Sequence, residues 1–396
     1  MEANHDGRGK RVKILHVCLA SSYTEGMTYQ DNMLATQNAA DGHDVIVISD
    51  CTCYEKGRIV PTQPEDRILA NGIRLARLPF DRIFTRFVSD KLRKTKQLRP
   101  LIDQFAPDVI LFHGCAGNEL LTVAKYKEAH PHVKLYADSH EDFNNSARNF
   151  LSKNTLHRLF YKPIAHRALP WIDRIFYLTE ETKHFMHFFY KIPEDKLEFY
   201  PLGGTVFSSE ERNEMRATKR NELGLGDNDI LLCHSGKLDI HKRTESILTA
   251  LSRIKSERLK LVIIGNIPDE MKPILKPLIE ADKRVTFLGW KSGDELLKYL
   301  CACDMYVQPG SQSATMQNAL CCGAPVMLYP HISHTALIEK YGMRDNSYFV
   351  KNADDIEQAL KDIMANPEKL AVMGKNSLEF AEKVLDYRRL AARLYE

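Results

Sequence analysis

Apolar and polar positions in the first half of the chain alternate between short β-branched runs and longer stretches with helical spacing. The runs predict strands at residues 12–18, 44–49, 109–113, 134–138 and 174–178. The helical stretches lie at residues 28–40, 88–105, 118–130 and 181–190. Because strands and helices take turns, we expect a parallel sheet with helices on both faces.

The same pattern starts again in the second half. Strands are predicted at residues 229–234, 259–264, 284–288, 305–308 and 326–328. Helices are predicted at residues 244–255, 269–281, 293–301, 315–322, 354–366 and 367–384. A chain of 396 residues is also long enough to build two hydrophobic cores. The predicted fold class is therefore α/β, with two Rossmann-like domains.

A proline and two glycines within residues 201–204 interrupt both patterns. They place the boundary between an N-terminal domain of residues 1–203 and a C-terminal domain of residues 204–377. A last helix at about 378–396 has apolar residues at helical spacing, and it could pack back on the first domain. Ligands of open α/β sheets bind beyond the carboxyl ends of the strands, so we expect a site where the two domains face each other.

One long segment in the second half carries no charge. Residues 305–338 contain no Asp, Glu, Lys or Arg, although 27% of the whole chain is charged. Gln, Asn, Pro and His interrupt the segment, so it is not a membrane span. Its hydroxyls, amides and backbone N–H groups suit a neutral pocket for a ligand that brings its own negative charge.

Composition excludes several functions. A net charge of +3 gives no sign of nucleic-acid binding. The nine cysteines include no CxxC pair, which favours reduced thiols over a metal site. The polar N-terminus lacks a signal-peptide core, so a cytoplasmic protein is expected. No GxGxxG or GxxxxGK[ST] motif is present, which weakens dinucleotide and ATP binding. The triplet Asp227–Asn228–Asp229 precedes a strand and is interpreted as a polar turn.

Two segments of the second half follow strands and suit phosphate. Lys237 and Lys242 lie between a strand and a helix, where ammonium groups and helix N–H groups attract anions. Ser311, Ser313 and Thr315 follow another strand, where a helix begins, and could cradle a diphosphate. A solvated basic loop and simple N-capping by Ser313 remain as the alternative interpretations.

The first half offers a titratable cluster and two basic segments. His140 follows a strand, with Glu141 and Asp142 beside it, and could be a general base, a metal ligand, a sugar-binding group or a structural residue. Residues 82–99 hold seven Lys or Arg, and residues 143–172 hold five without any acid. Such stretches suit an anionic membrane surface or an anionic acceptor, and an ordinary solvated face explains them equally well.

Several segments together resemble the family 4 glycosyltransferases, which have the GT-B fold. They are GHDVIVIS, APDVILFHG, SHEDF, YPLGGTVF, HSGKLDIHKRTESILTAL, LKLVIIGN and NALCCGAPVM. The resemblance implies transfer of a sugar, with retention of configuration, from a UDP- or GDP-sugar to a glycan or lipid-linked acceptor. It further implies surface polysaccharide biosynthesis, no metal or cofactor, and a place in the cytoplasm or on the cytoplasmic face of the membrane.

The resemblance also implies roles for individual residues. His140 would lie beside the transferred sugar, while Lys237 and Lys242 would hold the diphosphate and stabilise the leaving charge. Donor-binding residues would be Gly26, Met27, Gly236, Arg243, Asn266, Gly310, Ser311, Gln312, Ser313, Ala314, Thr315 and Asn318. Acceptor-binding residues would be Tyr29, His113, Glu141 and Asp142.

The chain departs from the family at two positions. The family often has two glutamates eight residues apart in the second domain, and this chain has Gly310 and Asn318 there. Asn318 could still hydrogen-bond a ribose. The missing acids leave a second hypothesis, a catalytically silent sugar-nucleotide-binding partner of another transferase. An epimerase or a phosphorylase of the same architecture is a weaker one.

Overall fold

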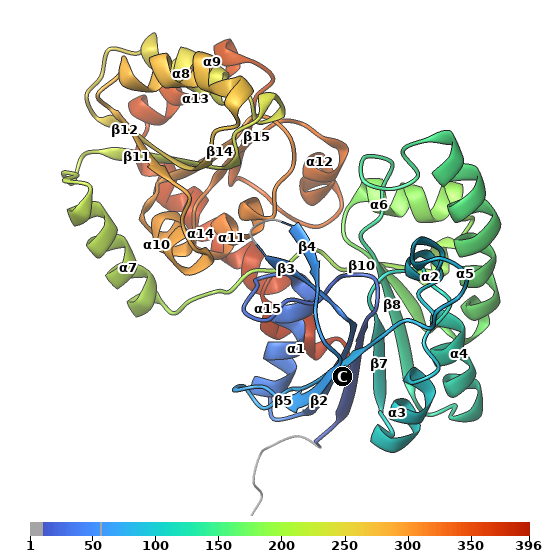
Figure 1. The fold of residues 1–396 in the computed structure, drawn as a ribbon. Helices are drawn as coiled ribbons and strands as arrows, with labels where there is room; N and C mark the ends of the chain where they lie inside the picture. The colour runs from blue at the N-terminus through green and yellow to red at the C-terminus, as the bar shows by residue number, and fades with distance from the viewer. Residues whose placement is uncertain (1–10, 56–57) are drawn as a thin grey trace, which may run out of the picture. The chain divides into compact units, whose positions relative to one another are not determined.

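A computed structural model describes residues 11–55 and 58–396. The chain forms two compact units (Figure 1). Unit 1 comprises the residues up to Pro201 together with Leu390–Glu396, and unit 2 comprises Leu202–Arg389. The predicted α/β class with two Rossmann-like domains is confirmed, since each unit is a mainly parallel sheet with helices around it.

Unit 1 holds an eight-stranded sheet in the order β10-β9-β8-β7-β1-β2-β6-β5. Only β5 runs antiparallel to its neighbour among these strands. The strands are β1 (Lys13–Cys18), β2 (Asp44–Asp50), β5 (Glu65–Ile68), β6 (Arg74–Leu78), β7 (Val109–Phe112), β8 (Lys134–Ser139), β9 (Arg174–Tyr177) and β10 (Leu197–Phe199). A separate hairpin pairs β3 (Thr52–Glu55) with β4 (Arg58–Pro61).

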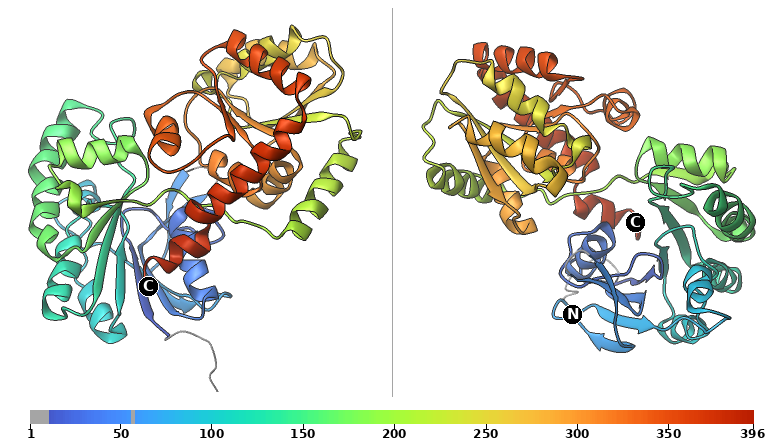
Figure 2. Two further views of the ribbon diagram at one scale, coloured as in Figure 1. Left: turned by 180° about the vertical axis from the view of Figure 1, so that it is seen from behind. Right: turned by 45° about the horizontal axis from the view of Figure 1, so that its top comes forward.

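Helices cover both faces of this sheet (Figure 2). They are α1 (Gln30–Ala40), α2 (Arg86–Leu92), α3 (Leu98–Phe105), α4 (Leu120–Ala129), α5 (Lys162–Ala168), α6 (Glu180–His184) and the π-helices η1 (Ser152–Tyr161) and η3 (Phe185–Phe189), with 3₁₀ turns η2 (Leu169–Trp171) and η4 (Glu194–Lys196). Alternate strand residues feed two cores: Leu15 and Ile46 belong to one, Val45 and Val47 to the other. This alternation is the period of two expected of a sheet that is buried on both faces.

The helix predicted at residues 88–105 is wrong as a single element. It is interrupted between α2 and α3, where Arg93 takes a left-handed conformation with φ 49°. The break is held from outside the segment, because the Arg93 guanidinium donates to the Ala116 carbonyl and the amide of Thr95 donates to the Glu119 carboxylate. Contacts with a distant loop thus outweigh the helical spacing of the apolar residues.

The last predicted helix is also divided. α14 (Glu368–Val384) ends before α15 (Tyr387–Ala392), and only Leu390–Glu396 belong to unit 1. That short tail is tied to unit 1 by the Tyr200 hydroxyl, which donates to the Leu390 carbonyl, and by the Arg393 guanidinium, 4.6 Å from the Tyr200 ring.

Unit 2 holds a six-stranded parallel sheet in the order β13-β12-β11-β14-β15-β16. The strands are β11 (Ile230–Lys237), β12 (Leu259–Asn266), β13 (Val285–Gly289), β14 (Met305–Gln308), β15 (Val326–Leu328) and β16 (Ser347–Phe349). The chain proceeds from β11 through β12 to β13 on one side and then returns to β14 on the other. This is the doubly wound order, with its reversal between β11 and β14.

Eight helices and two 3₁₀ turns surround the sheet of unit 2 within the described ranges. They are α7 (Ser209–Glu222), η5 (Ile240–Lys242), α8 (Thr244–Ser252), η6 (Asp269–Met271), α9 (Lys272–Glu280), α10 (Gly293–Ala302), α11 (Thr315–Cys321), α12 (Ile332–Glu339), α13 (Ala353–Ala365) and α14. The sequence did not predict α7 or α12. α7 is almost entirely polar and buries only Lys219, so its apolar spacing gives no signal. No helix in the described part of the chain is long and apolar enough to cross a bilayer.

Two glycines let β11 and β12 approach at their carboxyl ends. Gly265 has φ +148°, and a Cβ added there would lie 1.8 Å from the carbonyl oxygen of Gly236. No side chain fits without moving one of the strands, so this pair of glycines fixes how Lys237 leaves the sheet.

We expect Gly265→Ala to lower the free energy of unfolding of unit 2 by about 3 kcal/mol or more, because steric overlap adds to a strained backbone. The matched control is Gly342→Ala, at φ +82° with nothing within 4 Å of the added Cβ. The control should cost about 1 kcal/mol, the left-handed backbone alone. Denaturant unfolding would measure both, and equal losses would contradict the steric account.

Candidate functional site

The strand-order reversal in unit 2 brings two loops together. The chain leaves β11 into η5 and α8, and it leaves β14 into the loop of residues 309–314, which leads to α11. β11 and β14 are hydrogen-bonded neighbours in the sheet. The helices that follow the strands on either side of such a reversal diverge, and the space at the carboxyl ends of the strands is the usual ligand site.

The 309–314 loop lies directly on the backbone of η5. A Cβ added at Gly310 would be 2.0 Å from the carbonyl oxygen of His241, and the amide of Ser311 donates to the same oxygen at 2.8 Å. Only a glycine permits this approach. The position where the family often has a sugar-contacting glutamate therefore cannot carry any side chain in this arrangement.

Lys242 joins the turn and the loop. Its Nζ donates to the carbonyls of Ser311 and Gln312, each at 3.2 Å, and its side chain crosses Gly236. Only 7% of Lys242 is exposed. Burial lowers the pKa of its ammonium group, although the nearby Asp239 opposes that shift. An ammonium group has three N–H donors, so one remains for an anion after the two carbonyls are satisfied.

The other predicted cations differ in how they are held. Lys237 is the exposed last residue of β11, and its side chain has no hydrogen bond or ion pair with any described residue. The sequence placed Gly236 and Lys237 in a loop, but β11 continues through both. Arg243 is already engaged: it donates to the Lys351 carbonyl at 2.8 Å and stacks 4.5 Å from the Tyr329 ring. Asn266 is the last residue of β12 and lies opposite Lys237 of β11 in the register of the two strands.

Neutral groups line the remainder of the loop. Ser313 and Thr315 share a hydroxyl hydrogen bond of 3.1 Å, and the Thr315 amide donates to Ser313 Oγ at 3.3 Å. Ala314 is the N-cap of α11 and makes no side-chain cap hydrogen bond. Asn318 points elsewhere, since a Cβ on Gly204 would lie 2.9 Å from its Oδ1. The structure therefore gathers Gly236, Lys242, Gly310 and Ser311 but sets Asn318 against the Gly204 backbone.

Sequence reasoning missed three supports of this loop. Gln308 is fully buried at the end of β14, and its amide donates to the Ser311 carbonyl at 2.9 Å. His331 Nε2 lies 3.2 Å from the Gly310 carbonyl. His234 in β11 contacts the Val307 carbonyl and the Thr244 hydroxyl, and burial lowers its pKa to about 4. For Gln308 and His234 the available signal was a polar residue inside an apolar strand, and it does not identify the partner.

Unit 1 reverses its strand order between β1 and β7, and a row of polar side chains crosses that point. His16 Nδ1 lies 3.0 Å from His113 Nε2, and His16 Nε2 lies 3.0 Å from Asn38 Oδ1. His113 Nδ1 lies 2.6 Å from Asp138 Oδ2. His16, His113 and Asp138 are each at most 2% exposed. Sequence reasoning missed His16, Asn38 and Asp138.

The hydrogen bonds of this row assign its protons. Asn38 Oδ1 can only accept, so His16 donates from Nε2. Burial, together with the neighbouring His113, lowers the pKa of His16 to about 3, so its Nδ1 accepts. His113 then donates from Nε2 to His16. Its Nδ1 shares a short hydrogen bond with the Asp138 carboxyl group.

Asp138 links this buried pair to His140. Its Oδ1 accepts from the Gly114 amide at 2.7 Å and lies 3.6 Å from His140 Nε2. Burial opposes the charge of Asp138, but attraction by His113 and His140 outweighs it and lowers the pKa of the carboxyl. The His140 side chain is 46% exposed. Desolvation by the surrounding protein disfavours its charge, yet the Asp138 carboxylate prevails and raises the pKa of His140.

The remaining predicted residues of unit 1 differ in their surroundings. Burial raises the pKa of Glu141, whose Oε2 has no partner among the described residues. Asp142 is occupied by its own turn, accepting from the amides of Asn144 and Asn145. Tyr29 precedes α1 and is half exposed. Gly26 and Met27 form a tight turn on Thr24, and Gly26 has φ +77°. His113, predicted to bind the acceptor, is buried, and its Nδ1 contacts Asp138.

Two family models match the chain. The glycosyl transferase 4-like domain matches residues 25–203, and the model of glycosyl transferases group 1 matches residues 215–380. Comparison with curated protein sequences gives no significant match.

Solved structures similar to the chain include several transferases. The sucrose-phosphate synthase of Thermosynechococcus elongatus is 16% identical, with a TM-score of 0.66 over 97% of both chains. The lipopolysaccharide glycosyltransferase WaaG is 13% identical, with a TM-score of 0.62 over 96% of this chain and 99% of its own. HepE of Anabaena, solved with UDP-glucose, is 13% identical, with a TM-score of 0.61 over 97% and 98%. Such low identities establish a shared fold.

We expect Asp138→Asn to lower the pKa of His140, because the neutral amide no longer attracts the imidazolium ion. NMR titration of the His140 ring would measure this shift. The matched control is Asp142→Asn, whose carboxylate serves its own turn and should leave the His140 pKa unchanged. The attraction stabilises the fold below the unfolded pKa of His140, and that stability is lost as pH rises through the raised folded value. A His140 pKa that is the same in Asp138→Asn and in the parent chain would refute the assignment.

Proposed function

This chain belongs to the family 4-like glycosyltransferases with the GT-B fold, and from that premise we propose that it transfers a hexosyl group from a nucleotide sugar, with retention of configuration, to a glycan or lipid-linked acceptor of a surface polysaccharide. The observation that carries the proposal is the contact of Lys242 with the 309–314 loop. It combines a buried cation that has one free donor with a neutral loop at the strand-order reversal of unit 2.

The diphosphate of the donor would bind unit 2 beside Lys242, with the exposed Lys237 as a second cation. As the bond between sugar and phosphate breaks, negative charge accumulates on the leaving phosphate. Cations fixed in advance stabilise that charge in the transition state more than in the ground state. The two lysines would supply this stabilisation without a metal ion. The solved complex of HepE with UDP-glucose supports a UDP-sugar as the first donor to test.

The sugar would be held without a carboxylate from the 309–314 loop. Gly310 cannot carry a side chain, and the groups that remain there are hydroxyls, amides and backbone N–H groups. In unit 1, His140 is the exposed member of the row and would contact the transferred sugar or the acceptor. Its raised pKa favours the imidazolium form, which donates hydrogen bonds from both nitrogens.

The second candidate is a silent partner that binds a sugar nucleotide for another transferase. The absence of both acids, at Gly310 and Asn318, is what favours it. The two candidates differ in one measurable property, which is sustained turnover by the purified chain alone.

We expect a panel of UDP- and GDP-sugars to reveal one donor that the purified chain consumes, with membrane-lipid extracts supplied as acceptors. Lys242→Ala should lower kcat/KM by about 10²–10³-fold, because a fixed donor to the leaving charge is lost. Lys255→Ala removes an exposed lysine of the same unit and should change nothing. Binding of a nucleotide sugar without turnover would favour the silent partner, and neither binding nor turnover would reject both candidates.

A basic and aromatic surface of unit 1 supports membrane association. The side chains of Phe84 and Phe150 are 91% and 84% exposed, on the two basic segments at residues 82–99 and 143–172. The segments touch, since the Tyr161 hydroxyl donates to the Lys91 carbonyl at 2.7 Å. We propose that this surface holds the enzyme on the anionic cytoplasmic face of the membrane, where a lipid-linked acceptor resides.

The full chain should sediment with anionic vesicles and not with neutral ones, and added salt should release it because surface charges are screened. The double variant Phe150→Ser with Leu151→Ser should bind roughly tenfold more weakly, since two apolar side chains no longer enter the lipid. Val372→Ser, an exposed apolar position of unit 2, is the control and should bind as the parent does. Sedimentation that depends neither on salt nor on lipid charge would contradict the proposal.

A further inference from the structure

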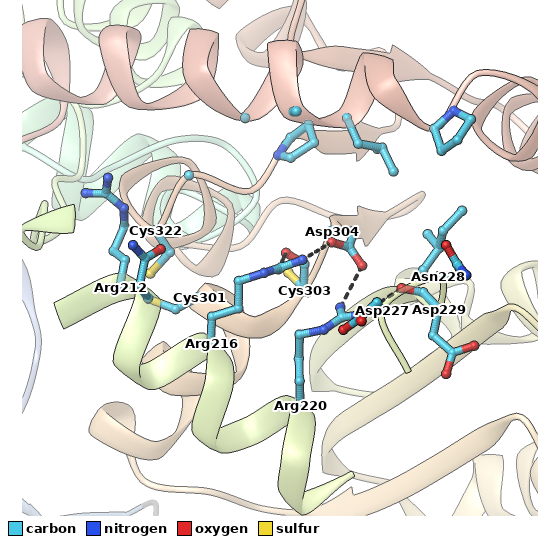
Figure 3. A pocket seen from close by; sticks show the side chains of 18 of the residues that line it. Arg212, Arg216, Arg220, Asp227, Asn228, Asp229, Cys301, Cys303, Asp304 and Cys322 are labelled. Carbon is cyan, nitrogen blue, oxygen red and sulfur yellow. Dashed lines mark hydrogen bonds and ion pairs between the residues drawn. The ribbon is translucent and has the colours of Figure 1, made fainter. Parts of the chain in front are cut away.

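Unit 2 has a pocket at the amino-terminal edge of its sheet, the edge away from Lys242. It has a volume of about 490 Å³ and lies between α7, the end of α10 and α14 (Figure 3). The turn predicted at Asp227–Asn228–Asp229 forms part of its wall. The nearby arginines of α7 are already engaged: Arg216 and Arg220 both bond Asp304. Simple anion binding therefore does not account for the pocket.

Three cysteines line the pocket: Cys301, Cys303 and Cys322. Figure 3 shows the side chains of Cys301 and Cys322 together, and each thiol has the largest influence on the pKa of the other. Cys322 Sγ also lies 3.7 Å from the Leu297 carbonyl. In a helix that carbonyl accepts the amide of Cys301, four residues on, so Cys322 rests against the turn of α10 that carries Cys301.

The surroundings distinguish Cys301 from its neighbours. The neighbouring Cys322 thiol lowers the pKa of Cys301, against its burial, and the positive charges of Arg212 and Arg216 lower it further. The pKa of Cys303 is raised by its hydrogen bond with Cys233, by burial and by Asp304. A thiol with a lowered pKa beside cations is the reactive kind, and a second thiol in contact is the usual resolving group. In the described residues, no three His, Cys, Asp or Glu are placed to hold a metal ion.

We propose that Cys301 and Cys322 form a peroxide-sensitive thiol pair, in which Cys301 reacts first and Cys322 resolves. The Cys301 thiolate attacks one oxygen of hydrogen peroxide, the O–O bond breaks, and the released hydroxide takes a proton to become water. The Cys322 sulfur then attacks the sulfenic acid on Cys301, the S–O bond breaks and a second water leaves. The two thiols lose two electrons to become a disulfide, and peroxide gains them.

The disulfide would close a ring that contains β14, the 309–314 loop and α11. Cys322 Sγ lies 3.7 Å from the Leu297 carbonyl, on the turn of α10 that precedes Cys301. The bond would therefore restrain the segment that Lys242 holds, from the opposite edge of the sheet. This site does not depend on the proposed donor or acceptor.

Peptide mapping tests the pair in the full chain. Residues 299–340 contain no Lys or Arg before Lys340, so trypsin alone leaves all four cysteines of this region on one peptide. A second protease that cuts before Asp304 separates residues 299–303 from 304–340. After treatment with hydrogen peroxide and blocking of free thiols, the two fragments should stay joined until a reductant is added.

Four variants identify the partners. Cys301→Ser and Cys322→Ser should abolish the joined fragments, while Cys303→Ser and Cys321→Ser should keep them. Joined fragments that persist in Cys301→Ser or Cys322→Ser would overturn the proposal. The proposal would also be overturned if peroxide-treated parent chain gave the same digest as untreated chain under conditions that oxidise Cys51 and Cys53. These two are the less buried thiols of unit 1.

A second measurement separates chemistry from folding. In Cys322→Ser the sulfenic acid cannot be resolved, so dimedone should label Cys301 about tenfold faster than Cys303. Cooperative thermal unfolding of the variant would establish that the label reports a folded chain. Equal labelling of Cys301 and Cys303 in the folded variant would overturn the assignment of the reacting thiol.

Discussion

The reversal of strand order within each sheet is the constraint on which the rest of the structure depends. In unit 1 the order turns at β1 and β7, and in unit 2 it turns at β11 and β14. Connections on the two sides of such a point must depart in opposite directions, so the carboxyl ends of the two central strands stay uncovered. Both chemically unusual clusters of the chain lie there, the row around Asp138 and the contact of Lys242 with the 309–314 loop.

The two clusters handle buried charge in opposite ways. Asp138 lies between two histidines, the buried His113 and the more exposed His140, and its carboxylate raises the pKa of His140. Lys242 has no carboxylate partner among the described residues and is satisfied by two neutral carbonyls. A buried cation that lacks an opposite charge is costly, and an arriving anion relieves that cost. The electrostatics of unit 2 thus favour a negatively charged ligand before any ligand contact is considered.

How far the sequence predicts this molecule depends on the range of the interactions. The strands, the restart of the pattern and the residues that follow each strand are local features, and they made Lys237, Lys242 and His140 candidates for the site. The row in unit 1 joins residues far apart in sequence: His16 to His113, and His113 to Asp138. No local pattern pairs them, and a histidine inside an apolar strand carries no sign of its partner. The break between α2 and α3 was not predicted for the same reason, because it is held by hydrogen bonds to Glu119 and Ala116.

Gly310 shows why a departure from a family motif need not mean a lost function. Read alone, glycine in place of glutamate removes a sugar contact. In the structure the same glycine lets the loop lie directly against η5. There the Ser311 amide donates to the His241 carbonyl, and the carbonyls of Ser311 and Gln312 accept from Lys242. A glutamate there would force the loop away from η5 and break those bonds, since its Cβ alone would overlap the His241 carbonyl. The two arrangements exclude each other. In this chain the wall of the proposed donor site is therefore backbone and hydroxyl, placed close to the cation, where a carboxylate would have offset the positive charge that a diphosphate requires.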